Sequence, residues 1–148
     1  MENKIIKIPP KNPEGINGKM RAGHVALRTT DYDGIINWYK EKLGFRLLHE
    51  WTVGALKLAY LAPANDDDFW LEVITGAVTG QAWDPALPIV SGYQHWCLDV
   101  ESVDETVEAV RQRGVKVLRE PFDIPGAGKR ACYIADLHDN VIEFTENL

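Results

Sequence analysis

The chain has little of what a disulfide-stapled, membrane-spanning or nucleic-acid-binding protein needs. Only two of its 148 residues are cysteines, Cys97 and Cys132, and no C-x-x-C pair occurs. This rules out a disulfide scaffold and favours a reduced compartment. No apolar run approaches the roughly 18 residues that a membrane span requires. With 16 basic and 22 acidic residues the net charge is −6, so no basic surface for nucleic acid is expected.

The rest of the composition is that of an ordinary globular domain. Hydrophobic residues make up 45% and charged residues 26% of the chain, and the length fits one domain with a real core. The first residues are too polar and too rich in proline for a signal peptide. We therefore expect a cytoplasmic protein with neither nucleic-acid nor membrane partners.

Two His/Glu pairs with equal spacing are the most informative feature that is present. His24 and Glu72 are 48 residues apart, His95 and Glu143 are also 48 residues apart, and the second pair follows the first by 71 positions. Both residue types bind divalent metals. A duplicated unit that supplies one histidine and one glutamate per copy would form a four-ligand N/O site.

The pattern around each pair predicts the element order β-α-β-β-β, twice. Each predicted helix ends at a glycine, Gly44 or Gly114, and Ser102 with Glu105 forms a capping-box pattern before the second helix. The expected helices cover about residues 31–43 and 103–113. The expected strands cover about residues 23–29, 45–51, 56–61, 69–75, 94–100, 115–119, 131–135 and 141–145.

These elements predict an α+β fold in which two tandem βαβββ modules form a curved mixed-sheet cup. Residues 1–22 form an N-terminal extension, either an edge strand or a tail, and residues 23–148 form a single domain. Its first module covers about residues 23–76, a linker residues 77–93, and the second module about residues 94–148. The linker contains no charge run, so we expect an ordered crossing.

Strand alternation places all four candidate ligands on the face of the sheet away from the helices. Val25 and Leu27 form the apolar face of the first strand, so His24 lies on the opposite face. The same parity holds for Glu72, His95 and Glu143. If the two sheets curve into a cup, the four side chains converge inside it. The alternative is a degenerate repeat whose cup binds a ligand without metal.

Two nitrogen and two oxygen ligands without thiolate suit one divalent ion per site, such as Ni, Zn, Co, Mn or Fe. A carboxylate on a mostly apolar wall is costly unless it is paired or bound to metal. An octahedral ion with four protein ligands keeps two open positions, which a small-molecule substrate with adjacent oxygens could occupy.

The chain resembles the vicinal oxygen chelate superfamily, which includes glyoxalase I, bleomycin-resistance proteins and extradiol dioxygenases. The resemblance covers about residues 23–146 and is carried by the stretches HVALRTTDYDGIINWYKEKLGFRLL, FWLEVITG, HWCLDVESVDETVEAVRQRGVKV and YIADLHDNVIEF. The ligand set His24, Glu72, His95 and Glu143 is similar to that of bacterial glyoxalase I. Gly76 and Ser91 stand where glutathione contacts are expected, which speaks against a thiol substrate.

The resemblance implies a glyoxalase I-like lyase or isomerase. Its metal would act as a Lewis acid for proton transfer next to a chelated carbonyl, through an enediolate, with Glu143 or Glu72 as the general base. Arg28 matches a position that holds a substrate carboxylate, or it forms a surface salt bridge. The resemblance also implies a homodimer, with the site either shared between two chains or closed within one.

Further candidate substrate contacts come from the residues themselves. Cys97 lies on the cup face near His95 and either contacts substrate or fills space; Trp70 is an aromatic candidate. Residues 122–129, FDIPGAGK, could form a lid from which Lys129 binds an anion. His49 and His138 read as surface residues. Two other functions stay open: a metal-independent, antibiotic-type binding or resistance protein, and an Fe(II) extradiol dioxygenase that uses His24, His95 and Glu143.

Overall fold

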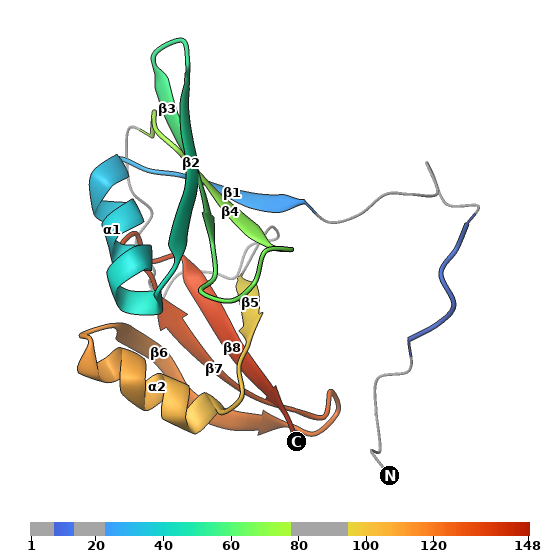
Figure 1. The fold of residues 1–148 in the computed structure, drawn as a ribbon. Helices are drawn as coiled ribbons and strands as arrows, with labels where there is room; N and C mark the ends of the chain where they lie inside the picture. The colour runs from blue at the N-terminus through green and yellow to red at the C-terminus, as the bar shows by residue number, and fades with distance from the viewer. Residues whose placement is uncertain (1–7, 14–22, 78–94) are drawn as a thin grey trace.

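The computed structural model describes residues 8–13, 23–77 and 95–148. The chain forms two four-stranded sheets, each with one helix, and both helices lie on the same side of the molecule (Figure 1). The first module contains β1 (His24–Arg28), α1 (Tyr32–Leu43), β2 (Arg46–Val53), β3 (Leu56–Ala62) and β4 (Trp70–Ile74). The second contains β5 (Trp96–Asp99), α2 (Val103–Gln112), β6 (Lys116–Ile124), β7 (Lys129–Ala135) and β8 (Val141–Asn147).

The two sheets have the same topology. The strand order is β1-β4-β3-β2 in the first and β5-β8-β7-β6 in the second. The first strand of each module runs parallel to the last, and the other neighbours are antiparallel. The predicted α+β fold with twin βαβββ modules is thereby confirmed. Among the described strands, the first strand of each module lies at an edge of its sheet, with its histidine at or just before its start.

Both helices begin and end where local sequence dictates. The Asp31 side chain accepts a hydrogen bond from the Gly34 backbone N–H, and Ser102 Oγ accepts one from the Glu105 N–H at 3.2 Å. Gly44 caps α1 with φ +71°, and Gly114 follows α2 with φ +75°. A side chain at either glycine would be strained, because L-residues rarely adopt this left-handed conformation.

One continuous core lies on the helix side of both sheets. Ile35, Leu71, Val103, Ile134 and Ile142 are fully buried in it, and Val25 and Leu27 pack against it as strand alternation predicts. Trp96 of β5 contacts Tyr39 and Phe45 of the first module with ring centroids 6.2 and 6.1 Å apart. The modules therefore pack through their helix-facing sides, and the candidate ligands are left on the other faces.

The turn between β7 and β8 fastens the second module to the first. Tyr39 of α1 donates a hydrogen bond to buried Asp136 at 2.8 Å, and the same carboxylate accepts from the backbone of His138 and Asn140. His138 Nε2 lies 2.6 Å from the hydroxyl of buried Thr29. The prediction that His138 is a plain surface residue was wrong, because the turn bends it back onto the first module.

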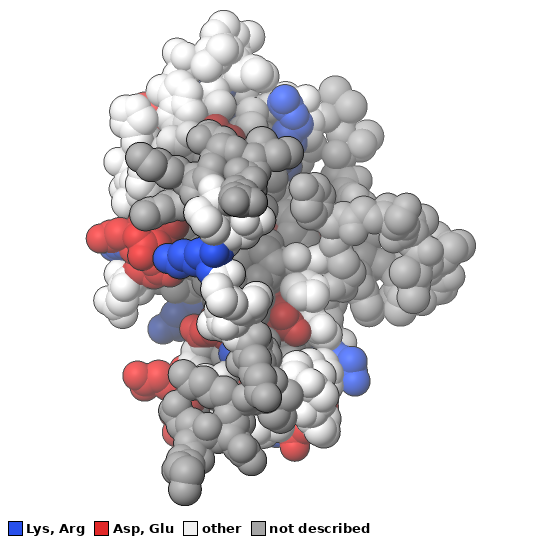
Figure 2. All heavy atoms as spheres, turned by 90° about the vertical axis from the view of Figure 1, so that its right-hand side faces the viewer, with Lys and Arg blue, Asp and Glu red and all other residues white. Residues whose placement is uncertain are grey.

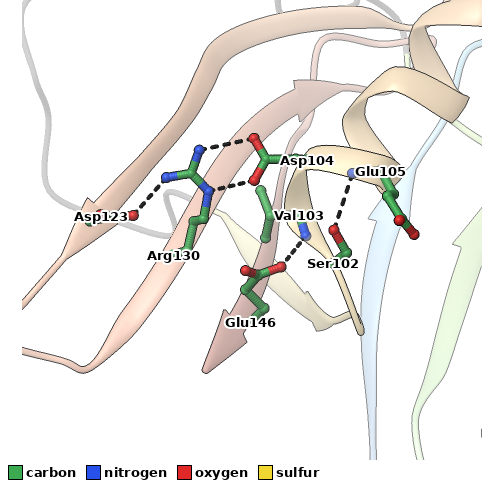
Figure 3. A network of polar contacts seen from close by, with 7 residues as sticks. All are labelled: Ser102, Val103, Asp104, Glu105, Asp123, Arg130 and Glu146. Carbon is green, nitrogen blue, oxygen red and sulfur yellow. Dashed lines mark hydrogen bonds and ion pairs between the residues drawn. The ribbon is translucent and has the colours of Figure 1, made fainter. Parts of the chain in front are cut away.

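A polar network anchors the N-terminus of α2 to its sheet (Figure 3). Arg130 of β7 donates to both carboxylate oxygens of Asp104 at 2.7 and 2.9 Å and to Asp123 of β6 at 2.6 Å. The Glu146 carboxylate accepts a hydrogen bond from the Val103 backbone N–H. These contacts hold the N-terminus of α2 against β6, β7 and β8. They thereby also hold β8, the strand that carries Glu143.

Several expectations fall outside this description or are changed by it. The N-terminal extension is described only at residues 8–13, without regular structure, and the linker at 77–93 lies almost wholly outside the described residues. Residues 122–129 belong to a β-hairpin: they end β6, turn over 125–128 and begin β7. That this hairpin covers the site stays a prediction. Neither described helix has the length and apolar character of a membrane-spanning helix. Basic and acidic side chains interleave on the face in Figure 2.

Candidate metal centre

Each predicted His/Glu pair forms a direct contact. His24 Nε2 lies 3.2 Å from Glu72 Oε2, and His95 Nε2 lies 3.1 Å from Glu143 Oε2. Both glutamates are 12% exposed at the side chain, whereas the histidines are 39% and 30% exposed. Each carboxylate is thus nearly enclosed and presents one oxygen to an imidazole nitrogen that solvent can reach.

These distances fit two ligands of one divalent ion. Nitrogen and oxygen atoms bound at about 2.0 to 2.2 Å at tetrahedral or octahedral angles lie about 2.8 to 3.6 Å apart. The spacing within each pair falls in this range. A hydrogen bond between an imidazole and a carboxylate has a similar length. The stronger indication of a metal site is therefore the combination of histidine and glutamate and its repetition in both modules.

One chain brings the four ligands together as two pairs and not as a set of four. Within the described parts of the chain, no three His, Cys, Asp or Glu side chains lie close enough to share an ion. The reason is the packing: Trp96, Tyr39 and Phe45 join the modules through their helix-facing sides. The expected convergence of all four residues in one cup is therefore not formed by a single chain.

The sheet registers place equivalent residues beside each glutamate. Glu72 is paired with Ala26 on β1 and with Tyr60 on β3. Glu143 is paired with Cys97 on β5 and with Tyr133 on β7. Each tyrosine ring also lies 5.4 Å from the ring of its module's histidine. A His, a Tyr and a Glu therefore recur on the ligand face of both modules.

Sequence reasoning missed the two tyrosines. Tyr60 precedes its glutamate by 12 positions and Tyr133 precedes its own by 10, so no equal spacing reveals them. The difference arises because seven residues join β3 to β4 but five join β7 to β8. The available signal was strand parity: Tyr60 lies between buried Ala59 and Leu61, and Tyr133 lies between buried Cys132 and Ile134, so each tyrosine points to the ligand face.

Polar side chains surround the second pair. The Cys97 thiol lies 3.4 Å from Thr145 Oγ1, Thr145 donates to Asp99 at 2.6 Å, and Lys129 donates to Asp99 at 3.1 Å. Hydrogen bonds from Thr145 and then Lys129 lower the pKa of Asp99. Lys129, predicted to bind an anionic substrate, is thus paired with a carboxylate beside the site.

Glu143 itself influences both neighbours across the sheet. The pKa of Tyr133 is raised first by burial of the phenol and then by the charge and hydrogen bonding of the Glu143 carboxylate. The pKa of the Cys97 thiol is raised by partial burial, lowered by its Thr145 hydrogen bond, and raised again by Glu143. Both cysteines are free thiols.

Aromatic rings surround the first pair instead. The rings of His49, Trp51, Tyr60 and Trp70 follow one another across β2, β3 and β4, with successive centroids 5.5, 4.6 and 5.2 Å apart. Trp70 is 38% exposed and donates its indole N–H to the Asp67 carbonyl at 2.8 Å. We refer to these four residues as the aromatic ladder. His49 is exposed, as predicted, and stacks on Trp51 at one end of the aromatic ladder.

Arg28 lies at the far end of β1 from His24. Its guanidinium donates to the Thr75 carbonyl at 3.0 Å and lies on the same strand face as His24. Among the described residues, no carboxylate forms an ion pair with it. Its expected contact with a substrate carboxylate stays a prediction.

A hollow in the described structure lies apart from the His/Glu pairs. It measures about 650 Å³, lies between the modules and is lined by Phe45, Phe69, Leu98 and Val110 among others. None of the four candidate ligands lines it. Two residues beside the second pair, Cys97 and Asp99, do line it.

The glyoxalase/bleomycin resistance protein/dioxygenase superfamily has a sequence profile that matches residues 21–144. The chain belongs to this superfamily. A domain of the same superfamily from Frankia sp. EAN1pec has a TM-score of 0.69 at 19% identity, covering 87% of this chain and 98% of that one. This likeness concerns the fold alone.

Two relatives in the superfamily are named for a specific activity. "Probable lactoylglutathione lyase, chloroplastic" of Arabidopsis thaliana is 32% identical over 122 residues, which are 81% of this chain and 34% of that protein. The lactoylglutathione lyase of Haemophilus influenzae is 28% identical over 130 residues, covering 86% of this chain and 93% of that protein. The chain spans only about a third of the plant relative's length.

Proposed function

We propose that this protein is a divalent-metal-dependent lyase or isomerase of the lactoylglutathione lyase type, acting on a small molecule with adjacent oxygens in the cytoplasm. The observation that carries the proposal is the His–Glu contact that recurs on the ligand face of both modules at 3.2 and 3.1 Å. The names of the relatives agree with this reaction class. The metal's identity is left open among Ni, Zn, Co, Mn and Fe.

A complete site requires two copies of the chain. One copy contributes His24 and Glu72, and a second copy contributes His95 and Glu143. Support comes from the separation of the pairs within one chain and from the position of β1 and β5 at the sheet edges of the described structure, where the histidines lie. Edge strands with unpaired backbone groups are natural places for another chain to join. A symmetric dimer would contain two such sites.

The ligands fit the chemistry of the reaction. When bound, the ion acts as a Lewis acid that polarises a substrate carbonyl. The side chains of His24, Glu72, His95 and Glu143 would hold it. Two histidine nitrogens and two carboxylate oxygens suit the borderline and hard divalent ions named above.

Glu143 is the general base in this proposal. It accepts the proton from the carbon next to the substrate carbonyl and returns it to the neighbouring carbon. Its side chain is nearly enclosed and borders His95, Tyr133 and Cys97. Glu72 lies between Ala26 and an aromatic ring and is better suited to remain a fixed ligand. Trp70 and Arg28 contact the apolar and anionic parts of the substrate.

A mixing experiment tests the shared site. His24→Ala and His95→Ala are each expected to abolish binding of a divalent ion and, with it, turnover of a 2-oxoaldehyde, which is assayed both with and without glutathione. A mixture of the two variants forms dimers in which one site has all four ligands, so activity should recover to about one quarter of wild type after random subunit exchange. Metal content of each species is measured in parallel.

The matched control is a mixture of His24→Ala with Glu72→Gln. Both changes affect the same half of the site, so no intact site forms and activity should not recover. No recovery in the first mixture would contradict the shared site. Wild-type protein without a bound divalent ion would contradict the proposed function as a whole.

The aromatic ladder favours one second candidate, a metal-independent binding protein. Stacked, partly exposed rings bind planar or apolar molecules without any ion. The two candidates differ in the need for metal: chelation abolishes the proposed turnover but leaves ligand binding to the aromatic ladder intact.

A further inference from the structure

A row of three side chains crosses the second sheet at Glu143. Cys97, Glu143 and Tyr133 are register partners on β5, β8 and β7. Residues in register on adjacent strands point to the same face and lie within contact distance. Glu143 is therefore flanked by a thiol on one side and a phenol on the other.

Both flanking groups are fixed by contacts of their own. The Tyr133 ring packs between the rings of His95 and Phe122, with centroids 5.4 and 5.8 Å away. The Cys97 thiol is held at 3.4 Å from Thr145 Oγ1, and Thr145 is in turn bound to Asp99. Two groups with restricted motion thus border a carboxylate whose position decides whether it can bind an ion.

The first module provides an internal comparison. The equivalent row there is Ala26, Glu72 and Tyr60, so a methyl group replaces the thiol. The Tyr60 ring lies 4.6 Å from Trp51 and 5.2 Å from Trp70, in a fully aromatic setting. Glu72 has one neighbouring donor in its row, whereas Glu143 has two.

We propose that Tyr133 and Cys97 are positioning residues for Glu143, which hold its carboxylate in place from the two neighbouring strands. The inference rests on the proposed function, because the position of Glu143 matters only if this residue binds an ion and moves a proton. The phenol is the stronger hydrogen-bond donor and the thiol the weaker one. Groups that orient a metal ligand in this way typically contribute a factor of about 10 to 100 to metal affinity or activity.

The experiment titrates metal-free full-length protein with Co²⁺, whose visible absorption depends on the number and arrangement of its ligands. Tyr133→Phe keeps the ring and removes only the hydroxyl; it should weaken Co²⁺ binding roughly tenfold and change the absorption band. Cys97→Ala copies the row of the first module and should cause a smaller loss. Cys97→Ser retains a donor and should restore the affinity.

Tyr32→Phe is the matched control. Its hydroxyl hydrogen-bonds to Glu50 and to the Leu58 carbonyl, away from the His/Glu pairs, so Co²⁺ affinity and the absorption band should stay those of wild type. Thermal unfolding of every variant checks that the fold is kept. Cys97→Ala and Cys97→Ser test the inference even if Tyr133→Phe proves unstable.

The outcomes separate the two proposals. Wild-type affinity and spectrum in both Tyr133→Phe and Cys97→Ala, with loss of binding in Glu143→Gln, would overturn the positioning role and leave the proposed function standing. A wild-type protein that binds no Co²⁺ would overturn both. A loss in Tyr133→Phe together with recovery in Cys97→Ser supports the inference, since a merely structural role would not distinguish serine from alanine.

Discussion

The two modules have the same order of helices and strands, but different side chains surround the His/Glu pair in each. In the first module, His24 and Glu72 face the aromatic ladder of His49, Trp51, Tyr60 and Trp70. In the second, His95 and Glu143 face Cys97 and Tyr133 and the hydrogen-bonded chain of Thr145, Asp99 and Lys129.

This difference suggests a division of labour within one site. A wall of aromatic rings offers apolar contact area and cannot stabilise a moving proton, whereas a wall of hydroxyl, thiol and charged groups can. If a site combines the first module of one chain with the second module of another, it has one apolar side for binding and one polar side for chemistry. Duplication of the module allowed each copy to specialise.

Replacing each glutamate by glutamine should give the largest difference between the two modules. Glu143→Gln should lower kcat by a factor of about 10² to 10⁴ at saturating metal, because it removes the general base. Glu72→Gln removes only a ligand and should lower kcat less once metal is saturating. Steady-state kinetics over a range of metal concentrations measures both. A larger kcat loss in Glu72→Gln would reverse the assignment of base and fixed ligand.

Truncation of an aromatic residue in each module tests the binding side. Trp51→Ala removes the central ring of the aromatic ladder and should raise KM for a substrate with an apolar group about twofold to tenfold, with little change in kcat. Phe122→Ala, the matched change near Tyr133 in the second module, should affect KM less. Equal increases in KM would mean that apolar contact is not confined to the first module.

The smallest expected effect concerns the hydrogen-bonded side chains of Thr145, Asp99 and Lys129, which have no counterpart among the described residues of the first module. Folding lowers the pKa of Asp99 below its ordinary value of 3.8, through the hydrogen bonds from Thr145 and Lys129. Its contribution to stability is therefore present above that value and is lost as the pH falls through the lowered folded pKa. Because the side chain is 78% exposed, solvent screens the interaction and the contribution is small.

Asp99→Asn should accordingly destabilise the protein slightly at pH 7, and the difference from wild type should shrink as the pH falls through the lowered folded pKa of Asp99. Urea unfolding at a series of pH values measures this. Arg28→Gln, at the equivalent position of the first module, should show no such convergence at low pH. A difference between Asp99→Asn and wild type that is independent of pH would rule out the charge as its cause.

Much of this arrangement could be read from the sequence because its signals are local. Alternation of apolar residues predicts which strand face His24, Glu72, His95 and Glu143 occupy, and Asp31, Gly44, Ser102 and Gly114 lie at the helix ends. The prediction ended β6 at residue 119, but the strand continues to Ile124. Pro121 lies in this extra part, where the pairing with β7 shifts register. A proline and an irregular ladder conceal a strand from pattern reasoning.

The remaining misses are contacts between segments far apart in the chain. His138 was read as a surface residue, but the turn that carries it folds against Thr29, which lies 109 positions earlier. Residues 122–129 were expected to form a lid because of their glycines and proline; the strands on either side pair into a hairpin, and its covering of the site stays a prediction. Composition indicates a turn and does not tell what the turn packs against.

By itself, the sequence determined the twin modules, their helix ends and the face that carries each ligand, because spacing, capping and strand alternation act over a few neighbouring residues. Only the tertiary structure decided which side chains flank each glutamate, because cross-strand register depends on turn length, seven residues before β4 and five before β8. It also decided that one chain keeps the two pairs apart, because Trp96, Tyr39 and Phe45 bury the helix-facing sides of both modules against each other.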